Sequence, residues 1–138
     1  MLTILIVDDE RLILNGCRIM IERNLKFPFP IQVFTANKAT DAIELLKENE
    51  VDLVLTDIRM PEMDGFALIC SLHSLCYTGE IVILTSHADF EYARKALRLN
   101  ISDFLLKPID QNELERLICS AWEKKKSKEQ KQHDESCQ

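Results

Sequence analysis

The sequence predicts an α/β fold in which a five-stranded parallel sheet carries helices on both faces, a doubly wound arrangement. Short apolar runs alternate with longer segments of helical periodicity five times along the 138 residues, which is the pattern of repeated strand–helix units. The run at residues 51–56 is apolar almost throughout, as expected for a strand covered on both faces. A chain of this length makes one domain with a sizeable core.

In the first half of the chain we predict strands at residues 3–7 and 31–34 and helices at 11–25 and 38–48. The helices are predicted because apolar residues recur three or four positions apart and so share one face. In these two helices they are Leu14, Cys17, Ile21, Leu25, Ala39, Ala42, Ile43 and Leu46. The first helix is expected to end before Pro28, because proline cannot continue a helix.

In the second half we predict, in order, strand 51–56, a loop at 58–64, helix 65–76, strand 80–84, helix 89–100, strand 103–106 and a last helix from about residue 111. The apolar residues spaced for a core-facing stripe in the last two helices are Phe90, Ala93, Ala96, Leu97, Leu114, Leu117, Ile118, Ala121 and Trp122. No aliphatic or aromatic residue follows Trp122. We therefore expect one domain over residues 1–122, with 123–138 forming a charged helix end, a linker or a tail.

Composition excludes several classes of protein. The chain is 46% hydrophobic and 29% charged with a net charge of -6, an ordinary globular composition whose acidity argues against direct nucleic-acid binding. No apolar stretch reaches the length of a membrane span and no secretory signal is visible, so we expect a cytoplasmic protein with no membrane contact. The five cysteines are odd in number and scattered, which favours buried reduced thiols over a zinc or redox site.

Polar residues of different chemistry follow four of the predicted strands. Asp8 and Asp9 follow the first strand, Asp57 the third, Thr85 the fourth and Lys107 the fifth. In a parallel sheet these strand ends lie along one edge, where open α/β folds build their sites. Three adjacent carboxylates repel one another unless a cation intervenes, and Mg2+ prefers oxygen ligands. Aspartates after a strand can also simply cap the next helix, but the joint placement favours a magnesium site.

Asp57 is the predicted phosphoacceptor of this site. A carboxylate can attack phosphorus to give an aspartyl phosphate, and the transfer depends mainly on positioning and charge neutralisation. Mg2+ and Lys107 would neutralise the phosphoryl oxygens, and Thr85 would donate a hydrogen bond to one of them. At the Lys107–Pro108 bond the residues alone are compatible with either a cis or a trans peptide.

Four motifs in this order resemble the receiver domain of bacterial two-component response regulators, over about residues 1–122. They are Leu5-Ile6-Val7-Asp8-Asp9, Thr56-Asp57-Ile58-Arg59-Met60-Pro61-Glu62-Met63-Asp64-Gly65, Leu84-Thr85-Ser86 and Asp103-Phe104-Leu105-Leu106-Lys107-Pro108. The resemblance implies a flavodoxin-like sheet of order 2-1-3-4-5 with five helices. It also implies that Asp57 accepts a phosphoryl group from a sensor histidine kinase, so that the chain is a phosphoacceptor switch and not an enzyme.

The resemblance further implies how the site is assembled. Mg2+ would be bound by Asp9, Asp57 and the backbone carbonyl of Arg59, with Asp8 assisting. The peptide bond between Lys107 and Pro108 is implied to be cis.

Two further pairs of residues receive roles from the resemblance. Thr85 and Phe104 would form the switch, with Phe104 lacking the hydroxyl of the tyrosine that the family often has there. Arg59 and His87 occupy variable positions that we hypothesise to set the phosphoryl lifetime. The alternative is that both are solvated loop side chains.

Residues 57–61 and 89–97 resemble the receivers that are usually fused to an AraC-type DNA-binding domain. We therefore expect a transcription regulator that contacts DNA only through an output domain not in this sequence. The alternative is a stand-alone single-domain regulator that acts by protein–protein interaction. The expected partner-facing surface, which would also hold a homodimer, is the fourth helix, fifth strand and fifth helix, with Lys95, Leu99 and Phe104 as members.

Two other functions use similar residues. An aspartate-nucleophile phosphatase of the haloacid dehalogenase type needs a second carboxylate two residues after its nucleophile, and here that position is Arg59. A pseudo-receiver would bind partners without phosphorylation, but the complete set of pocket residues argues against it.

Overall fold

The computed structural model describes residues 1–60 and 65–136, with five side chains in 87–97 and those of 130–136 outside the description. Its strands are β1 (Leu2–Val7), β2 (Ile31–Ala36), β3 (Leu53–Asp57), β4 (Glu80–Thr85) and β5 (Asp103–Leu106). All pair in parallel, in the order β2-β1-β3-β4-β5. This confirms the predicted sheet and its order.

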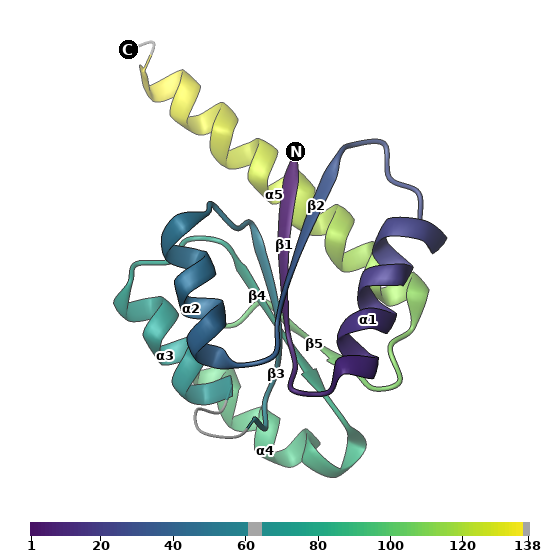
Figure 1. Ribbon diagram of the computed structural model, residues 1–138. Helices are drawn as coiled ribbons and strands as arrows, with labels where there is room; N and C mark the ends of the chain where they lie inside the picture. Colours follow the sequence, from purple (N-terminus) through teal and green to yellow (C-terminus); the bar gives the residue numbers. More distant parts are fainter. Residues whose placement is uncertain (61–64, 137–138) are drawn as a thin grey trace.

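The helices are α1 (Arg11–Ile19), α2 (Ala39–Glu48), α3 (Gly65–Ser74), α4 (Phe90–Arg94) and α5 (Gln111–Ser136). Figure 1 shows α1 and α5 on one face of the sheet and α2 and α3 on the other. The two apolar cores follow this division, because alternate residues of a strand point to opposite faces. On β1, Ile4 and Ile6 pack with α1 and α5, whereas Leu5 and Val7 pack with α2 and α3.

The predicted helix at 89–100 is the main departure from the expected five regular helices. Among the described residues four α-helices have nine or more residues, whereas α4 has five and continues as a 3-10 turn over Lys95–Leu99. The turn ends at Asn100, whose left-handed φ of 59° is one that asparagine tolerates better than most residues. Phe90, expected to face the core, is 38% exposed. The expected core positions Ala93, Ala96 and Leu97 lie outside the described side chains.

Two other expectations need adjustment. The first helix becomes a π-helical turn over Met20–Asn24, and Leu25 is already extended ahead of the prolines. Of the cysteines, Cys17 is buried as expected, whereas Cys70 and Cys76 are exposed. The expected loop at 58–64 lies partly outside the described residues.

Helix α5 continues past Trp122 to Ser136 and extends beyond the end of the sheet (Figure 1). Trp122 stacks on Phe29 of the segment before β2, with ring centroids 4.5 Å apart and planes 11° apart. Further along, Lys125 Nζ lies 3.1 Å from Asp52 Oδ2, at the start of β3. The first turns beyond Trp122 therefore remain in contact with the body of the domain. No helix in the described ranges combines the length and the apolar character needed to cross a membrane.

Candidate functional site

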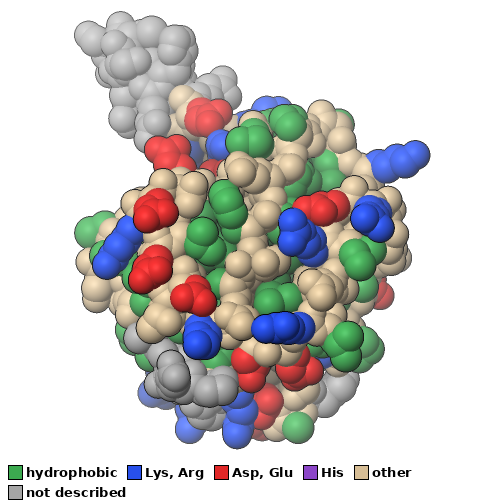
Figure 2. All heavy atoms as spheres, in the orientation of Figure 1, with side chains coloured by type: hydrophobic (Ala, Val, Ile, Leu, Met, Phe, Trp, Pro, Cys, Tyr) green, Lys and Arg blue, Asp and Glu red, His purple; other side chains and the backbone are tan. Residues whose placement is uncertain are grey.

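The candidate site lies where β1 and β3 end side by side. The register pairs Val7 with Thr56, so the next residues, Asp8 and Asp57, are neighbours at this edge of the sheet. Carboxylate oxygens of Asp8, Asp9 and Asp57 all lie within 4.8 Å of one another. Asp8 and Asp57 are buried and Asp9 is exposed. Figure 2 shows acidic side chains gathered near the lower edge of this face, where β1 ends in Figure 1.

Lys107 reaches this carboxylate cluster from the end of β5. Its Nζ lies 2.8 Å from Asp8 Oδ2 and 3.4 Å from Asp57 Oδ1. Its backbone N–H donates to the carbonyl of Thr85 over 2.7 Å, which ties the ends of β4 and β5 together. The Lys107–Pro108 peptide bond is cis. The structure thus brings the ammonium group between the two buried aspartates.

The remaining predicted site residues are Thr85 and Phe104, the proposed switch pair, and Arg59 and His87, the proposed lifetime residues. Thr85 is buried, and its hydroxyl donates to the carbonyl of Ser86 over 3.3 Å. Phe104 is partly buried against the core on the α2 and α3 face of the sheet, and its ring centroid lies 6.3 Å from that of Phe90. Arg59 lies on the loop after β3 with 62% of its side chain exposed. The side chain of His87 lies outside the described residues.

The electrostatics of the site are those of crowded, buried charge. Burial raises the pKa of Asp57 to about 6, the nearby Asp8 charge adds to this, and Lys107 opposes it. Burial likewise raises the pKa of Asp8, against the opposing effect of Lys107. Burial alone would lower the pKa of Lys107, but its contact with Asp8 and the attraction of Asp57 raise it. The lysine therefore stays charged, whereas its positive charge does not fully offset the cost of burying the two ionised carboxylates.

Backbone groups hold the two buried carboxylates in place. The N–H of Ile58 donates to Asp57 Oδ1 over 2.8 Å, and the N–H of Glu10 donates to Asp8 Oδ1 over 3.0 Å. Asp8 Oδ2 is buried, and its partner is the Lys107 ammonium group at 2.8 Å. One ammonium group beside three clustered carboxylates leaves negative charge in excess, and this oxygen-rich cluster fits a hard divalent cation that takes oxygen ligands.

Three residues near the site have no role in the sequence analysis. A Cβ on Gly65 would lie 2.5 Å from the carbonyl oxygen of Asp57, so glycine is required for the close approach of α3. Asp89 forms an ion pair with Arg59 and a hydrogen bond with Ser86. The spacing of Ser86 and Asp89, three residues apart before an apolar helix, is a capping signal that could have drawn attention to both.

Comparison with known proteins identifies the family. Residues 4–119 match the model of the response regulator receiver domain. The chain belongs to this family. Receiver domains are in general phosphoacceptor switches rather than true enzymes.

The receiver is similar to longer regulators. It is 36% identical over 118 residues to an uncharacterized response regulatory protein of Staphylococcus epidermidis, and 34% identical over 119 residues to the transcriptional regulatory protein HptR of Staphylococcus aureus. Each alignment covers 86% of this chain but 45% of the relative, so the chain spans less than half the length of these curated relatives.

A solved structure is also similar to this receiver. It is titled as a two component transcriptional regulator AraC from Clostridium phytofermentans, and it is 30% identical with a TM-score of 0.76. The match covers 89% of this chain and 94% of that one. The similarity therefore extends over nearly all of both folds.

Proposed function

We propose that this receiver accepts a phosphoryl group on Asp57 from the phosphohistidine of a sensor histidine kinase, in a Mg2+-dependent reaction. The observation that carries the proposal is the placement of Asp57. Its carboxylate is buried beside that of Asp8, and Asp57 Oδ1 lies 3.4 Å from Lys107 Nζ. Burial and a neighbouring carboxylate make the ionised form of such a group unfavourable unless a cation compensates its charge. Asp57 is well placed to become an aspartyl phosphate, a mixed anhydride, whose charge is neutralised by its neighbours.

The transfer forms a bond between an Asp57 carboxylate oxygen and phosphorus while the phosphorus–nitrogen bond to the kinase histidine breaks, its electron pair returning to the imidazole. Asp57 Oδ1 already accepts from the N–H of Ile58 over 2.8 Å, which orients the carboxylate. Lys107 neutralises charge on the transferring group, and Thr85 donates a hydrogen bond to one of its oxygens.

Asp9, Asp57 and the backbone carbonyl of Arg59 would hold Mg2+, with Asp8 assisting. When bound, the ion supplies positive charge that offsets the carboxylates and the phosphoryl oxygens. The cluster of carboxylate oxygens of Asp8, Asp9 and Asp57 supports this assignment.

Phosphorylation would act by favouring one of two packings of a partner-facing surface. We propose that Thr85 moves toward the phosphoryl group and that Phe104 repacks behind it. Phe104 lies in β5, the strand that follows α4 and precedes α5 in the chain, and its ring is near that of Phe90. The surface of α4, β5 and α5 would then bind a partner or a second copy of the chain.

We further propose that the receiver controls a transcriptional output domain that lies outside this sequence and binds DNA. The names of HptR and of the AraC regulator support this proposal. Residues 1–122 would be the receiver, and the charged segment that follows would be the end of its last helix and the start of a linker. A stand-alone regulator that acts on a protein partner is the alternative.

The test is phosphorylation by a small phosphodonor such as acetyl phosphate, followed by intact-mass measurement. We expect one phosphoryl group per chain with Mg2+, none after chelation with EDTA, and none in Asp57→Asn. Asp110→Asn, a change at an exposed cap of α5 outside the site, is the matched control and should be phosphorylated normally. Unmodified protein would indicate a pseudo-receiver, and rapid multiple turnover would indicate a phosphatase.

A further inference from the structure

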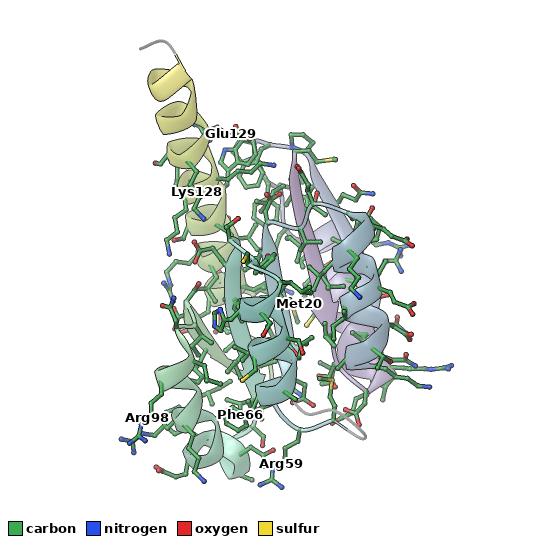
Figure 3. The ribbon with its side chains drawn as sticks, turned by 90° about the vertical axis from the view of Figure 1, so that its left-hand side faces the viewer. Met20, Arg59, Phe66, Arg98, Lys128 and Glu129 are labelled. Atoms are coloured by element: carbon green, nitrogen blue, oxygen red, sulfur yellow. The ribbon has the colours of Figure 1, made fainter. Side chains whose placement is uncertain are left out.

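Asp89 connects the two loops that border the candidate site. One of its carboxylate oxygens, Oδ1, lies 2.7 Å from Arg59 Nε, on the loop that follows Asp57. Its other oxygen, Oδ2, accepts a hydrogen bond of 3.2 Å from the hydroxyl of Ser86, the residue after Thr85. One carboxylate therefore contacts both the segment after the phosphoacceptor and the segment after the switch threonine. Figure 3 shows Arg59 at this end of the molecule, opposite Lys128 and Glu129.

The same carboxylate belongs to the cap of the segment that leads into α4. The N–H of Asp89 donates to the carbonyl and to the hydroxyl of Ser86, over 3.1 and 3.3 Å. The Ser86 hydroxyl thus accepts from the N–H of Asp89 and donates to its carboxylate, so that both bonds of the pair involve this hydroxyl. Because α4 begins at Phe90, any change in the position of Asp89 is passed directly to α4, a proposed part of the partner-facing surface.

Charge makes the Arg59–Asp89 contact sensitive to phosphorylation. Arg59 is two residues from Asp57, and a phosphoryl group on Asp57 would place about two negative charges within reach of its guanidinium. A guanidinium binds phosphate oxygens through two parallel N–H donors, so the phosphoryl group competes with Asp89 for Arg59. The Arg59 side chain is 62% exposed and that of Asp89 25%. A pair so exposed is weak enough to exchange partners.

We propose that Asp89 is a positioning residue that holds Arg59 against the start of α4 while Asp57 is unmodified, and that releases it when Asp57 carries a phosphoryl group. The proposal rests on the proposed phosphorylation of Asp57 and assigns its regulation. Through the Arg59–Asp89 ion pair, a change in the loop after β3 would alter the position of α4, in addition to any effect of a movement of Thr85. It also gives Arg59 a partner in the unmodified state and a different one in the phosphorylated state.

The test is the rate constant of phosphorylation by acetyl phosphate in Asp89→Asn, Arg59→Gln and the double variant. Asparagine can still accept from the Ser86 hydroxyl and so keeps the cap, but it has no charge to hold Arg59. We expect Asp89→Asn to react about two- to fivefold faster, because the guanidinium then assists the anionic donor. Raising the salt concentration should reduce this difference.

The double variant separates positioning from a general structural effect. If Asp89 acts through Arg59, Asp89→Asn should have no effect in the Arg59→Gln background. Glu91→Gln is the matched control. Glu91 lies two residues after Asp89 and carries the same charge, but its surface ion pair is with Arg94. The Glu91→Gln variant should react at the unsubstituted rate.

The possible failures are distinguishable. Two results would overturn the role of Asp89 and leave the proposed function standing. In the first, the unsubstituted chain is phosphorylated and Asp89→Asn reacts at the same rate. In the second, Asp89→Asn increases the rate by the same factor in the Arg59→Gln background as in the unsubstituted chain. If the unsubstituted chain is not phosphorylated at all, the proposed function fails and the role of Asp89 falls with it.

Discussion

At the scale of single residues, Asp57 has a carboxylate whose ionised form is less favourable in the folded protein than in water. Its carboxylate is buried beside Asp8, and burial together with that charge raises its pKa to about 6 from an ordinary 3.8. The folded state therefore holds a proton that the unfolded chain has already released at mildly acidic pH. Without a metal ion, the ionised carboxylate opposes folding near neutral pH.

We expect Asp57→Asn to raise the free energy of unfolding at about pH 7, in metal-free buffer, by about 1–3 kcal/mol, at roughly 1.4 kcal/mol per pKa unit. The stability that protonated Asp57 contributes is fully present below about pH 4. It is lost as the pH rises through about 6, because the folded pKa is the higher one. The variant lacks this loss, so the difference should be largest at neutral pH and small below about pH 4.

Urea unfolding at several pH values measures this difference. Glu44→Gln, an exposed position in α2, is the control and should show no such pH-dependent gain. An asparagine variant that is less stable at neutral pH, or a difference that does not vary with pH, would contradict the assignment.

At the scale of elements, α5 is held to the rest of the domain by contacts of two kinds. On one side Trp122 stacks on Phe29, whose ring centroid lies 5.4 Å from that of Phe27. On the other side Lys124 Nζ lies 3.3 Å from Glu80 Oε2, at the start of β4. The aromatic contact buries apolar surface, whereas this lysine is about half exposed. We therefore expect the aromatic stack to contribute more stability.

Trp122→Ala should lower the free energy of unfolding by about 2 kcal/mol, less than for a fully buried tryptophan because this ring is partly exposed. Leu12→Ala is the control, since Leu12 is 87% exposed and its truncation should change stability by less than about 0.5 kcal/mol. Far-UV circular dichroism during urea unfolding measures both. Equal stability of the two variants would mean that the stack does not anchor α5.

At the scale of the whole molecule, the candidate site and the end of α5 lie at opposite ends of the sheet, as Arg59 and Lys128 show in Figure 3. At the α5 end, Asp52 Oδ2 accepts the N–H of Thr3 over 2.8 Å and lies 3.1 Å from Lys125 Nζ. The carboxylate, one residue before β3, thus joins β1 to the middle of α5.

Amide hydrogen exchange should therefore show protection of α5 continuing past Trp122 to about Lys128. We expect Lys125→Met to reduce protection of that segment about two- to fivefold while the sheet is unchanged. Lys126→Met is the matched control, because Lys126 is an exposed neighbour on the same helix. The arrangement is refuted if both variants exchange alike, or if protection already ends at Trp122.

Local pattern was sufficient to predict the strands and the convergence of Asp8, Asp9, Asp57 and Lys107, whereas the order of the strands followed from the resemblance to receiver domains. Local pattern was insufficient for the helix expected at 89–100, where apolar spacing is helical but α4 has five residues. The spacing reports which residues could share a face, whereas packing and the left-handed Asn100 decide how many turns form.

The sequence by itself determined which acidic and basic residues lie at one edge of the sheet, because the carboxyl ends of parallel strands share that edge. Only the tertiary structure decided the contacts made across separate loops, such as the Asp89 carboxylate between Arg59 and Ser86, or Asp52 between Thr3 and Lys125. The physical reason is that periodicity encodes burial along each element. A pairing between exposed charges depends on the distance between elements, and no local pattern records that distance.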